Sequence, residues 1–237
     1  MIFFEHVPMF FFLFFLFVAS ELQYTVTVHH NGSRVCSGAL VSNRMVLTDA
    51  KCLKHPSSEY TVGILKSLNN IHILSRLEYF KVAEIHKDSA TKYLRSSVGA
   101  LVLEYSKPTL PSLLLDRAGI GSFANIPFKL VSRIRDHQGM DLKVINLDSF
   151  THKCPTYIEG KPIIPLCISQ KLLMDQLCSA DIGSPLIYYT GKVTWLVGLK
   201  GDCYKYSSSG DYITTGREYV EFSSIYSQYS WLKRIVK

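Results

Sequence analysis

The 237-residue sequence has no lysine or arginine before Arg34, although it contains 26 basic and 19 acidic residues and a net charge of +7. It also has no Cys-x-x-Cys pair, which argues against zinc ribbons and thioredoxin-like redox sites. Glycine and proline number only 14 and 9, which excludes collagen-like or linker sequence. Charged residues make up 19% and apolar residues 47% of the chain, so it has enough apolar surface to fold and is not disordered. This length fits one large all-β domain or two small domains.

The longest apolar run lies at the amino terminus and is too short to cross a bilayer. Met9 to Ala19 are eleven apolar residues, whereas a spanning helix needs about 20. Small residues follow at Val18-Ala19-Ser20, so we expect residues 1–20 to be a secretory signal peptide cleaved after Ser20. The absence of a basic residue before the run is atypical, and an uncleaved anchor is the alternative. The sequence thus predicts a secreted, extracellular protein with no membrane span.

All six cysteines follow this segment. An even number of cysteines behind a signal peptide indicates three disulfides formed in an oxidising compartment. Six cysteines allow fifteen pairings, and their count does not choose among them. The cysteines are Cys36, Cys52, Cys154, Cys167, Cys178 and Cys203.

Short runs of strand-forming residues recur through the remaining chain, with no βαβ pattern, and favour a β-sandwich or β-barrels. One amphipathic helix is expected at about residues 226–236, with basic residues in its last turn. A linker is expected near residues 107–111, between two halves of similar size. We expect strands at residues 24–28, 39–41, 45–47, 60–65, 77–85, 98–103, 128–134, 142–147, 185–189 and 194–199.

The Asn31-Gly32-Ser33 segment supports two compatible predictions. Asn-Gly is the preferred dipeptide of a two-residue hairpin turn. The same segment is the only glycosylation sequon, and a hairpin tip is exposed, so we expect a glycan on Asn31. The neighbouring His29 and His30 do not predict a metal site, because adjacent strand residues face opposite sides and no further ligand stands at motif spacing.

Four stretches, in order, resemble the trypsin-like serine protease family. Residues 35–52, ending Thr48-Asp-Ala-Lys-Cys52, resemble the family's segment around the catalytic histidine, which ends Thr-Ala-Ala-His-Cys. Val98-Gly-Ala-Leu101 resembles Asp-Ile-Ala-Leu, and residues 178–186, Cys-Ser-Ala-Asp-Ile-Gly-Ser-Pro-Leu, resemble the segment around the nucleophilic serine. Residues 220–225, followed by Trp231, resemble the last strand and terminal helix.

The resemblance implies an all-β fold of two six-stranded antiparallel β-barrels with a C-terminal α-helix. The domain would span residues 21–237, with the first barrel at about 21–110, the second at about 111–225 and the helix at about 226–236. The resemblance also implies the disulfides Cys36–Cys52, Cys154–Cys167 and Cys178–Cys203.

The same motifs argue against protease activity. The family's reaction needs a serine nucleophile, a histidine base and an aspartate that orients the histidine. The matching positions hold Ile182, Lys51 and Val98, and none of these side chains can take the corresponding role. Ala180 replaces the glycine of the oxyanion hole. We therefore expect no catalytic residues and no enzyme.

The family's activation switch is also expected to be missing. In active members a cut after a basic residue frees an amino terminus, which pairs with the acid that matches Asp181. Residues 1–33 contain no lysine or arginine and so offer no such cut. About four residues separate Ser20 from the first strand and span only about 14 Å, so we do not expect the amino terminus to reach Asp181. Asp181 must then be solvated or find another partner, because a buried unpaired carboxylate is costly.

The pocket that binds the substrate's side chain is expected to be altered. Its base position matches Gln176, and its wall matches Gly198, Leu199 and Lys200. A lysine at the pocket rim would narrow the groove and add positive charge. The alternative is a collapsed pocket filled by its own side chains.

These features predict a secreted, non-catalytic serine protease homologue that acts by binding as a cofactor, decoy or regulator of extracellular proteolysis. Its partner would be a protease, an inhibitor or a protease substrate, and the basic balance also permits an acidic glycan. One alternative is a divergent hydrolase that uses Lys51 with Ser179 or Ser184. Another is a structural or carrier protein of a secretion. We expect no cofactor, no metal and no nucleic acid, and the sequence leaves the oligomeric state open.

Overall fold

A computed structural model describes most of the chain after residue 23. The described residues are 24–65, 77–88, 97–106, 113–119, 126–136, 139–147, 166–191, 193–206, 212–213 and 218–236. The expected signal peptide, residues 1–20, and the linker near 107–111 lie outside them. Among the described residues, no helix is long and apolar enough to cross a membrane.

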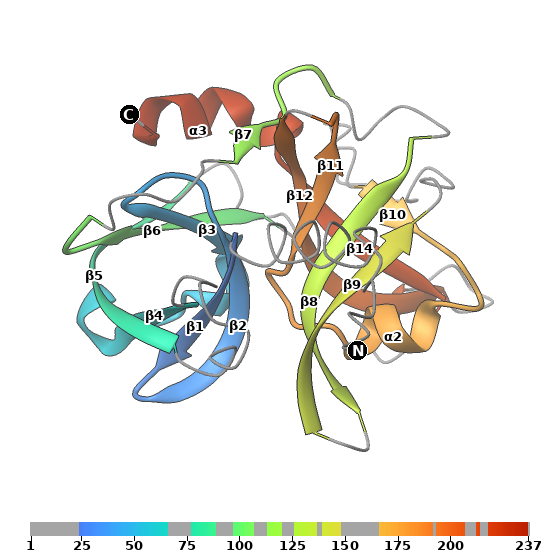
Figure 1. Ribbon diagram of the computed structural model, residues 1–237, viewed down its shortest axis with the longest axis horizontal. Helices are drawn as coiled ribbons and strands as arrows, with labels where there is room; N and C mark the ends of the chain where they lie inside the picture. Colours follow the sequence, from blue (N-terminus) through green and yellow to red (C-terminus); the bar gives the residue numbers. More distant parts are fainter. Residues whose placement is uncertain are drawn as a thin grey trace, which may run out of the picture.

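Six strands in the first half close into a barrel, in the order β1-β2-β3-β6-β5-β4 (Figure 1). All six pairings around this barrel are antiparallel. The strands are β1 (Thr25–His30), β2 (Ser33–Leu40), β3 (Met45–Asp49), β4 (Tyr60–Leu65), β5 (Leu77–Lys87) and β6 (Val98–Leu103). Two short 3₁₀ turns, Ala50–Cys52 and Ser57–Glu59, lie between β3 and β4.

The predicted Asn-Gly hairpin joins the first two strands. His30 pairs opposite Ser33, which leaves a two-residue loop. Asn31 has φ of 48° and Gly32 has φ of 77°, so both residues occupy the left-handed region. Asn and Gly adopt this conformation at low cost, which explains why the chain reverses here.

The second half forms a sheet with strand order β10-β14-β12-β11-β8-β9, to which β7 and β13 add at β12. The all-β prediction is confirmed, with this sheet in place of the expected second barrel. Its described strands form an eight-stranded sheet and not a closed six-stranded barrel, and β7 pairs with β12 in parallel. The strands are β7 (Leu114–Leu115), β8 (Phe128–Asp136), β9 (Gly139–Leu147), β10 (Leu166–Ile168), β11 (Pro185–Tyr189), β12 (Thr194–Tyr206), β13 (Tyr212–Ile213) and β14 (Tyr219–Ser224).

Among the residues that the structure describes, two helices accompany the second sheet. α2 (Met174–Ser179) precedes β11, and no side chain caps its first turn. The sequence did not predict α2, because six residues are too few to show helical periodicity. A 3₁₀ turn (Tyr226–Gln228) leads into α3 (Tyr229–Ile235), whose last turn carries Lys233 and Arg234.

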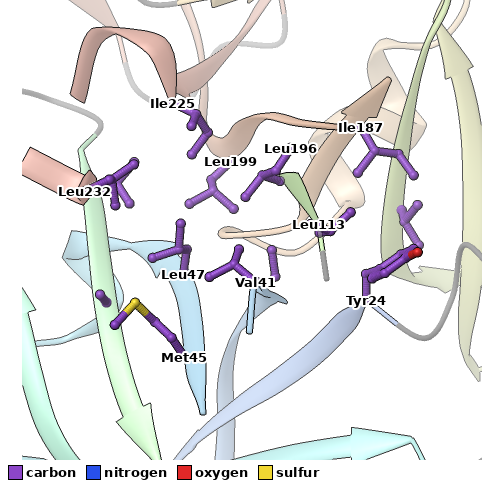
Figure 2. Packing of buried hydrophobic residues seen from close by; sticks show 14 of the residues in the cluster. Tyr24, Val41, Met45, Leu47, Leu113, Ile187, Leu196, Leu199, Ile225 and Leu232 are labelled. Atoms are coloured by element: carbon purple, nitrogen blue, oxygen red, sulfur yellow. The ribbon is translucent and has the colours of Figure 1, made fainter. Parts of the chain in front are cut away.

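The two halves share one apolar core, which Figure 2 shows. Each half also has a core of its own. The shared core contains side chains from β3 and the residues near it, from β11 and β12, and from α3. Val98 lies in this core, and Ile182 packs against the core of the first barrel. The fold therefore holds the positions matching the triad at the junction of the two halves. The labelled residues are Tyr24, Val41, Met45, Leu47, Leu113, Ile187, Leu196, Leu199, Ile225 and Leu232.

Candidate functional site

Lys51, which matches the catalytic histidine, follows β3 in a short 3₁₀ turn. Its backbone N–H donates to Asp49 Oδ1 at 3.0 Å, which caps the turn. Its Nζ lies 2.6 Å from Asp202 Oδ2 on β12. Lys51 is thus ion-paired across the junction of the two halves.

Val98, which matches the orienting aspartate, is the first residue of β6 and is fully buried. It pairs directly opposite Asp49, so it lies beside the turn that carries Lys51. Its backbone N–H donates to Gln228 Oε1 at 3.0 Å. The side chain contributes to the shared core and offers no polar atom.

Ile182, which matches the nucleophile, lies in the tight turn between α2 and β11. Its carbonyl accepts from the Ser37 N–H at 2.8 Å. The next residue, Gly183, has φ of 82°, and a Cβ there would collide with Ser37 O and Thr48 Oγ1. Glycine is required at this close approach, which fixes residues 181–184 (the 181–184 turn) against β2.

Asp181 has two side-chain partners from β2. Arg34 Nη2 lies 3.3 Å from Oδ1, and Ser37 Oγ donates to Oδ2 at 2.8 Å. The Asp181 N–H donates to Ser132 Oγ at 3.0 Å. These contacts answer the expectation that Asp181 finds another partner. The side chain that pairs with it comes from the first basic residue of the sequence.

The backbone donor at Ala180 is already occupied. Its N–H donates to Gln176 O at 3.0 Å and closes the last turn of α2. An oxyanion hole needs free N–H groups aimed at the developing negative charge. In this arrangement the Ala180 N–H points into the helix end and does not serve that role.

The pocket-equivalent residues differ widely in their exposure to solvent. Gln176 is exposed on α2, whereas Lys200 on β12 is only 2% exposed. The expectation that Lys200 lies at a pocket rim is therefore wrong. Gly198 pairs with Leu186 and Ser224, and Leu199 is buried in the shared core.

A cavity of about 340 Å³ lies elsewhere, beside α3. Its lining is mostly apolar and includes none of the pocket-equivalent residues. The lining residues are Val41, Leu113, Leu114, Leu115, Arg117, Trp195, Tyr229, Lys233 and Val236.

Burial shifts two ionisable groups near Lys51. Desolvation raises the pKa of Asp49 to about 6, although Lys51 and the hydrogen bond from its N–H oppose the rise. Desolvation lowers the pKa of Lys200 to about 8, although Asp202 opposes the fall. The Lys200 Nζ donates to Gly201 O at 3.2 Å. The junction therefore contains buried charges where the family places its triad.

Two of the three expected disulfides are confirmed. Cys36 pairs with Cys52 beside the Lys51 turn, and Cys178 pairs with Cys203, which links α2 to β12. The third expected pair includes Cys154, which lies outside the described residues, so Cys154–Cys167 stays a prediction.

The trypsin family model matches residues 18–109 of the chain. This stretch contains the closed barrel, together with Cys36, Cys52 and the positions of Lys51 and Val98. The chain has a trypsin-like fold. Beyond residue 109 the likeness rests on the second sheet, the Cys178–Cys203 bond and the motif at residues 178–186. No curated protein matches the sequence significantly.

The alternative catalytic pair expected for a divergent hydrolase is not assembled in this trypsin-like domain. Ser184 Oγ is fully buried and lies 2.6 Å from Ser132 Oγ. Ser179 Oγ donates to Asp175 O at 2.7 Å on α2. Because Lys51 pairs with Asp202, each of the three groups has a partner outside the proposed pair.

The site contains residues that the sequence did not single out. Arg34 and Asp202 provide the ion pairs of Asp181 and Lys51, from 147 and 151 residues away. Separations of this size carry no local spacing signal. The two adjacent histidines also have different partners: His29 contacts Thr27 and Tyr79, whereas His30 contacts Glu59 and His55.

Proposed function

We propose that this protein is a secreted, non-catalytic serine protease homologue that acts by binding. The observation that carries the proposal is the set of residues at the triad positions. Lys51, Val98 and Ile182 provide an ion-paired ammonium and two apolar side chains. A general base, its orienting acid and a nucleophile are all required for the family's chemistry.

The 181–184 turn and the residue before it give independent support. The Ala180 N–H is bonded within α2, and Asp181 is bonded to Arg34 and Ser37. Such contacts hold the turn in an arrangement without a free oxyanion donor at residue 180. Electrostatic stabilisation of this kind is commonly the largest catalytic contribution, so its loss removes more than a nucleophile.

A binding role is supported by the exposed surface beside the site. Leu172, in the turn before α2, is 96% exposed, and Gln176 on α2 is also exposed. Covering a large apolar side chain is favourable, so Leu172 is the residue of this surface at which we test for a partner. The partner class that fits is an extracellular protease, inhibitor or protease substrate.

The first experiment separates a binder from an enzyme. The secreted protein is incubated with a fluorophosphonate probe, with active trypsin as the positive control. We expect trypsin to be labelled and this protein to remain unlabelled at every pH from 6 to 9. Labelling at Ser179 or Ser184 would contradict the proposal and favour the divergent hydrolase.

The second experiment separates a specific binder from a structural scaffold. The protein is immobilised and exposed to the secretion from which it comes, beside the variants Leu172→Ser and Leu114→Ser. Leu114 is 43% exposed and lines the cavity beside α3, so it is the matched control. We expect Leu172→Ser to lose the captured proteins and Leu114→Ser to keep them. Equal loss in both variants, or no capture by the unaltered protein, would favour a scaffold role.

A further inference from the structure

Three potential metal ligands meet at one end of the first barrel. His30 ends β1, Glu59 ends the 3₁₀ turn before β4, and His55 lies in the loop before that turn. Their ligand atoms all lie within 4.8 Å of one another. His30 Nε2 is 2.7 Å from Glu59 Oε2, and His55 Nδ1 is 3.8 Å from the same oxygen. These three residues form what we call the His-His-Glu cluster.

The backbone positions of the cluster are fixed by the barrel and its first loop. His30 pairs opposite Tyr60, and the Asn31 N–H donates to Glu59 O at 3.0 Å. The Tyr60 hydroxyl donates to Cys52 O and accepts from the N–H groups of Lys54 and His55. The loop is therefore closed around a fully buried tyrosine. The three side chains are held near one another before any ligand arrives, which lowers the entropy lost on binding.

The distances fit a small ion with tetrahedral preference. Bonds of about 2.0–2.2 Å to nitrogen and oxygen ligands require ligand atoms about 3.3–3.6 Å apart. The two distances to Glu59 Oε2, 2.7 and 3.8 Å, lie on either side of that range. The His30 and His55 rings stack with centroids 3.9 Å apart, so one ring must turn. The side chain of His55 is 48% exposed, which leaves it room for that rotation.

The contacts at His30 Nε2 also suit a cation. Glu59 Oε2 at 2.7 Å requires a proton on this nitrogen, whereas Asn31 Nδ2, at 3.3 Å, would donate to its lone pair. One neutral nitrogen cannot do both. A cation can bind the lone pair of His30 Nε2 and the Glu59 carboxylate at the same time. The Asn31 amide is then free to turn towards solvent.

We propose that His30, His55 and Glu59 bind one Zn²⁺ ion, with water in the fourth position. Two imidazoles and one carboxylate are a ligand set that zinc uses with an open fourth position, and imidazole favours zinc over calcium and magnesium. The exposed fractions of the three side chains, from 22% to 48%, leave a path from solvent. This site goes beyond the proposed function and involves none of the residues at the triad positions.

The test is a zinc titration of untagged, secreted protein in competition with a chromogenic chelator. We expect one Zn²⁺ per chain, and at least a tenfold weaker affinity in each of His30→Gln, His55→Gln and Glu59→Gln. The matched control is His86→Gln, because His86 pairs, in the part of the chain that the structure describes, with one acidic residue, Glu84, at 3.1 Å. This control should keep the affinity of the unaltered protein.

A second readout guards against loss of affinity through misfolding. Co²⁺ in place of Zn²⁺ should give the visible absorption of a tetrahedral ion in the unaltered protein and in His86→Gln, and not in Glu59→Gln, while all three keep the same far-ultraviolet circular dichroism. No stoichiometric zinc binding in the unaltered protein would overturn the proposal. Equal affinity in the three cluster variants and the control would also overturn it.

Discussion

Arg34 Nη2 lies 3.3 Å from Asp181 Oδ1, and this pair joins β2 of the first barrel to the 181–184 turn of the second half. In the family that the chain resembles, the matching acid pairs with an amino terminus freed by a cut. Here a side chain provides the positive charge, and Ser37 adds a hydrogen bond of 2.8 Å. The turn is therefore held in place without any proteolytic step.

The first prediction concerns this ion pair. Arg34→Met leaves the carboxylate of Asp181 with one side-chain hydrogen bond, from Ser37, so we expect a loss of about 1–3 kcal/mol in the free energy of unfolding. The expected loss is smaller than for a fully buried ion pair, because the side chains of Arg34 and Asp181 are 22% and 16% exposed. Urea unfolding of Arg34→Met, Asp181→Asn and the double variant measures the coupling. Additive losses in the double variant would show that the pair contributes nothing of its own.

The second prediction uses the buried ammonium of Lys200. Its folded pKa is about 8 and the ordinary value is 10.5, so the unfolded chain binds more protons between these pH values. Stability should therefore rise as the pH rises from 8 towards 10.5, by roughly 3 kcal/mol at most. Urea unfolding at pH 8 and pH 10 tests this, with Lys200→Met as the comparison. A rise of the same size in Lys200→Met would assign the effect to other groups.

The third prediction concerns Asp49, whose folded pKa is about 6 against an ordinary value of 3.8. Between these values the folded chain binds more protons, so stability should fall as the pH rises from about 4 to about 6. Asp49→Asn removes this titration and keeps an acceptor for the Lys51 N–H. As the pH rises from about 4 to about 6, we expect the variant to gain up to roughly 3 kcal/mol in unfolding free energy relative to the unaltered protein. A difference that is constant with pH would contradict the assignment.

The fourth prediction is a glycan on Asn31. Asn31, Gly32 and Ser33 are all exposed at the tip of the β1–β2 hairpin. Protein secreted from eukaryotic cells should lose mass on treatment with an N-glycosidase. Ser33→Ala removes the sequon without altering the Asn-Gly turn, and it should abolish the mass change. An unaltered protein that is insensitive to the glycosidase would count against the prediction.

Five of the six strands of the first barrel and the fold class could be predicted from the sequence, because both depend on local signals. β2 was expected only at its end, as residues 39–41, whereas it covers Ser33–Leu40. A period-two pattern marks β1, and the Asn31-Gly32 dipeptide marks the hairpin between β1 and β2. The Cys36–Cys52 and Cys178–Cys203 bonds followed from the family resemblance and are confirmed. For the strands and the hairpin, a short segment contains the information that decides its structure.

The electrostatic details could not be predicted, because they depend on contacts between distant segments. Lys200 was expected at a pocket rim, but β12 places it inside, at 2% exposure. Arg34 and Asp181 are 147 residues apart in the sequence, and only the packing of the two halves brings them together. His30 was set aside as a ligand because its neighbour in sequence faces elsewhere, whereas its partners come from the loop that closes over Tyr60.

The central claim is that the site is dismantled and not merely missing its nucleophile, and restoring the triad tests it most directly. The triple variant Lys51→His, Val98→Asp and Ile182→Ser is assayed against a panel of chromogenic peptide esters and amides, with the single variant Ile182→Ser beside it. We predict no turnover by the single variant and at most feeble turnover by the triple variant, because the Ala180 N–H stays bonded to Gln176 O and Asp181 stays bonded to Arg34. Turnover by the triple variant at about 1 s⁻¹ or faster, an ordinary enzyme rate, would contradict the account and show that the groove and the 181–184 turn remain competent.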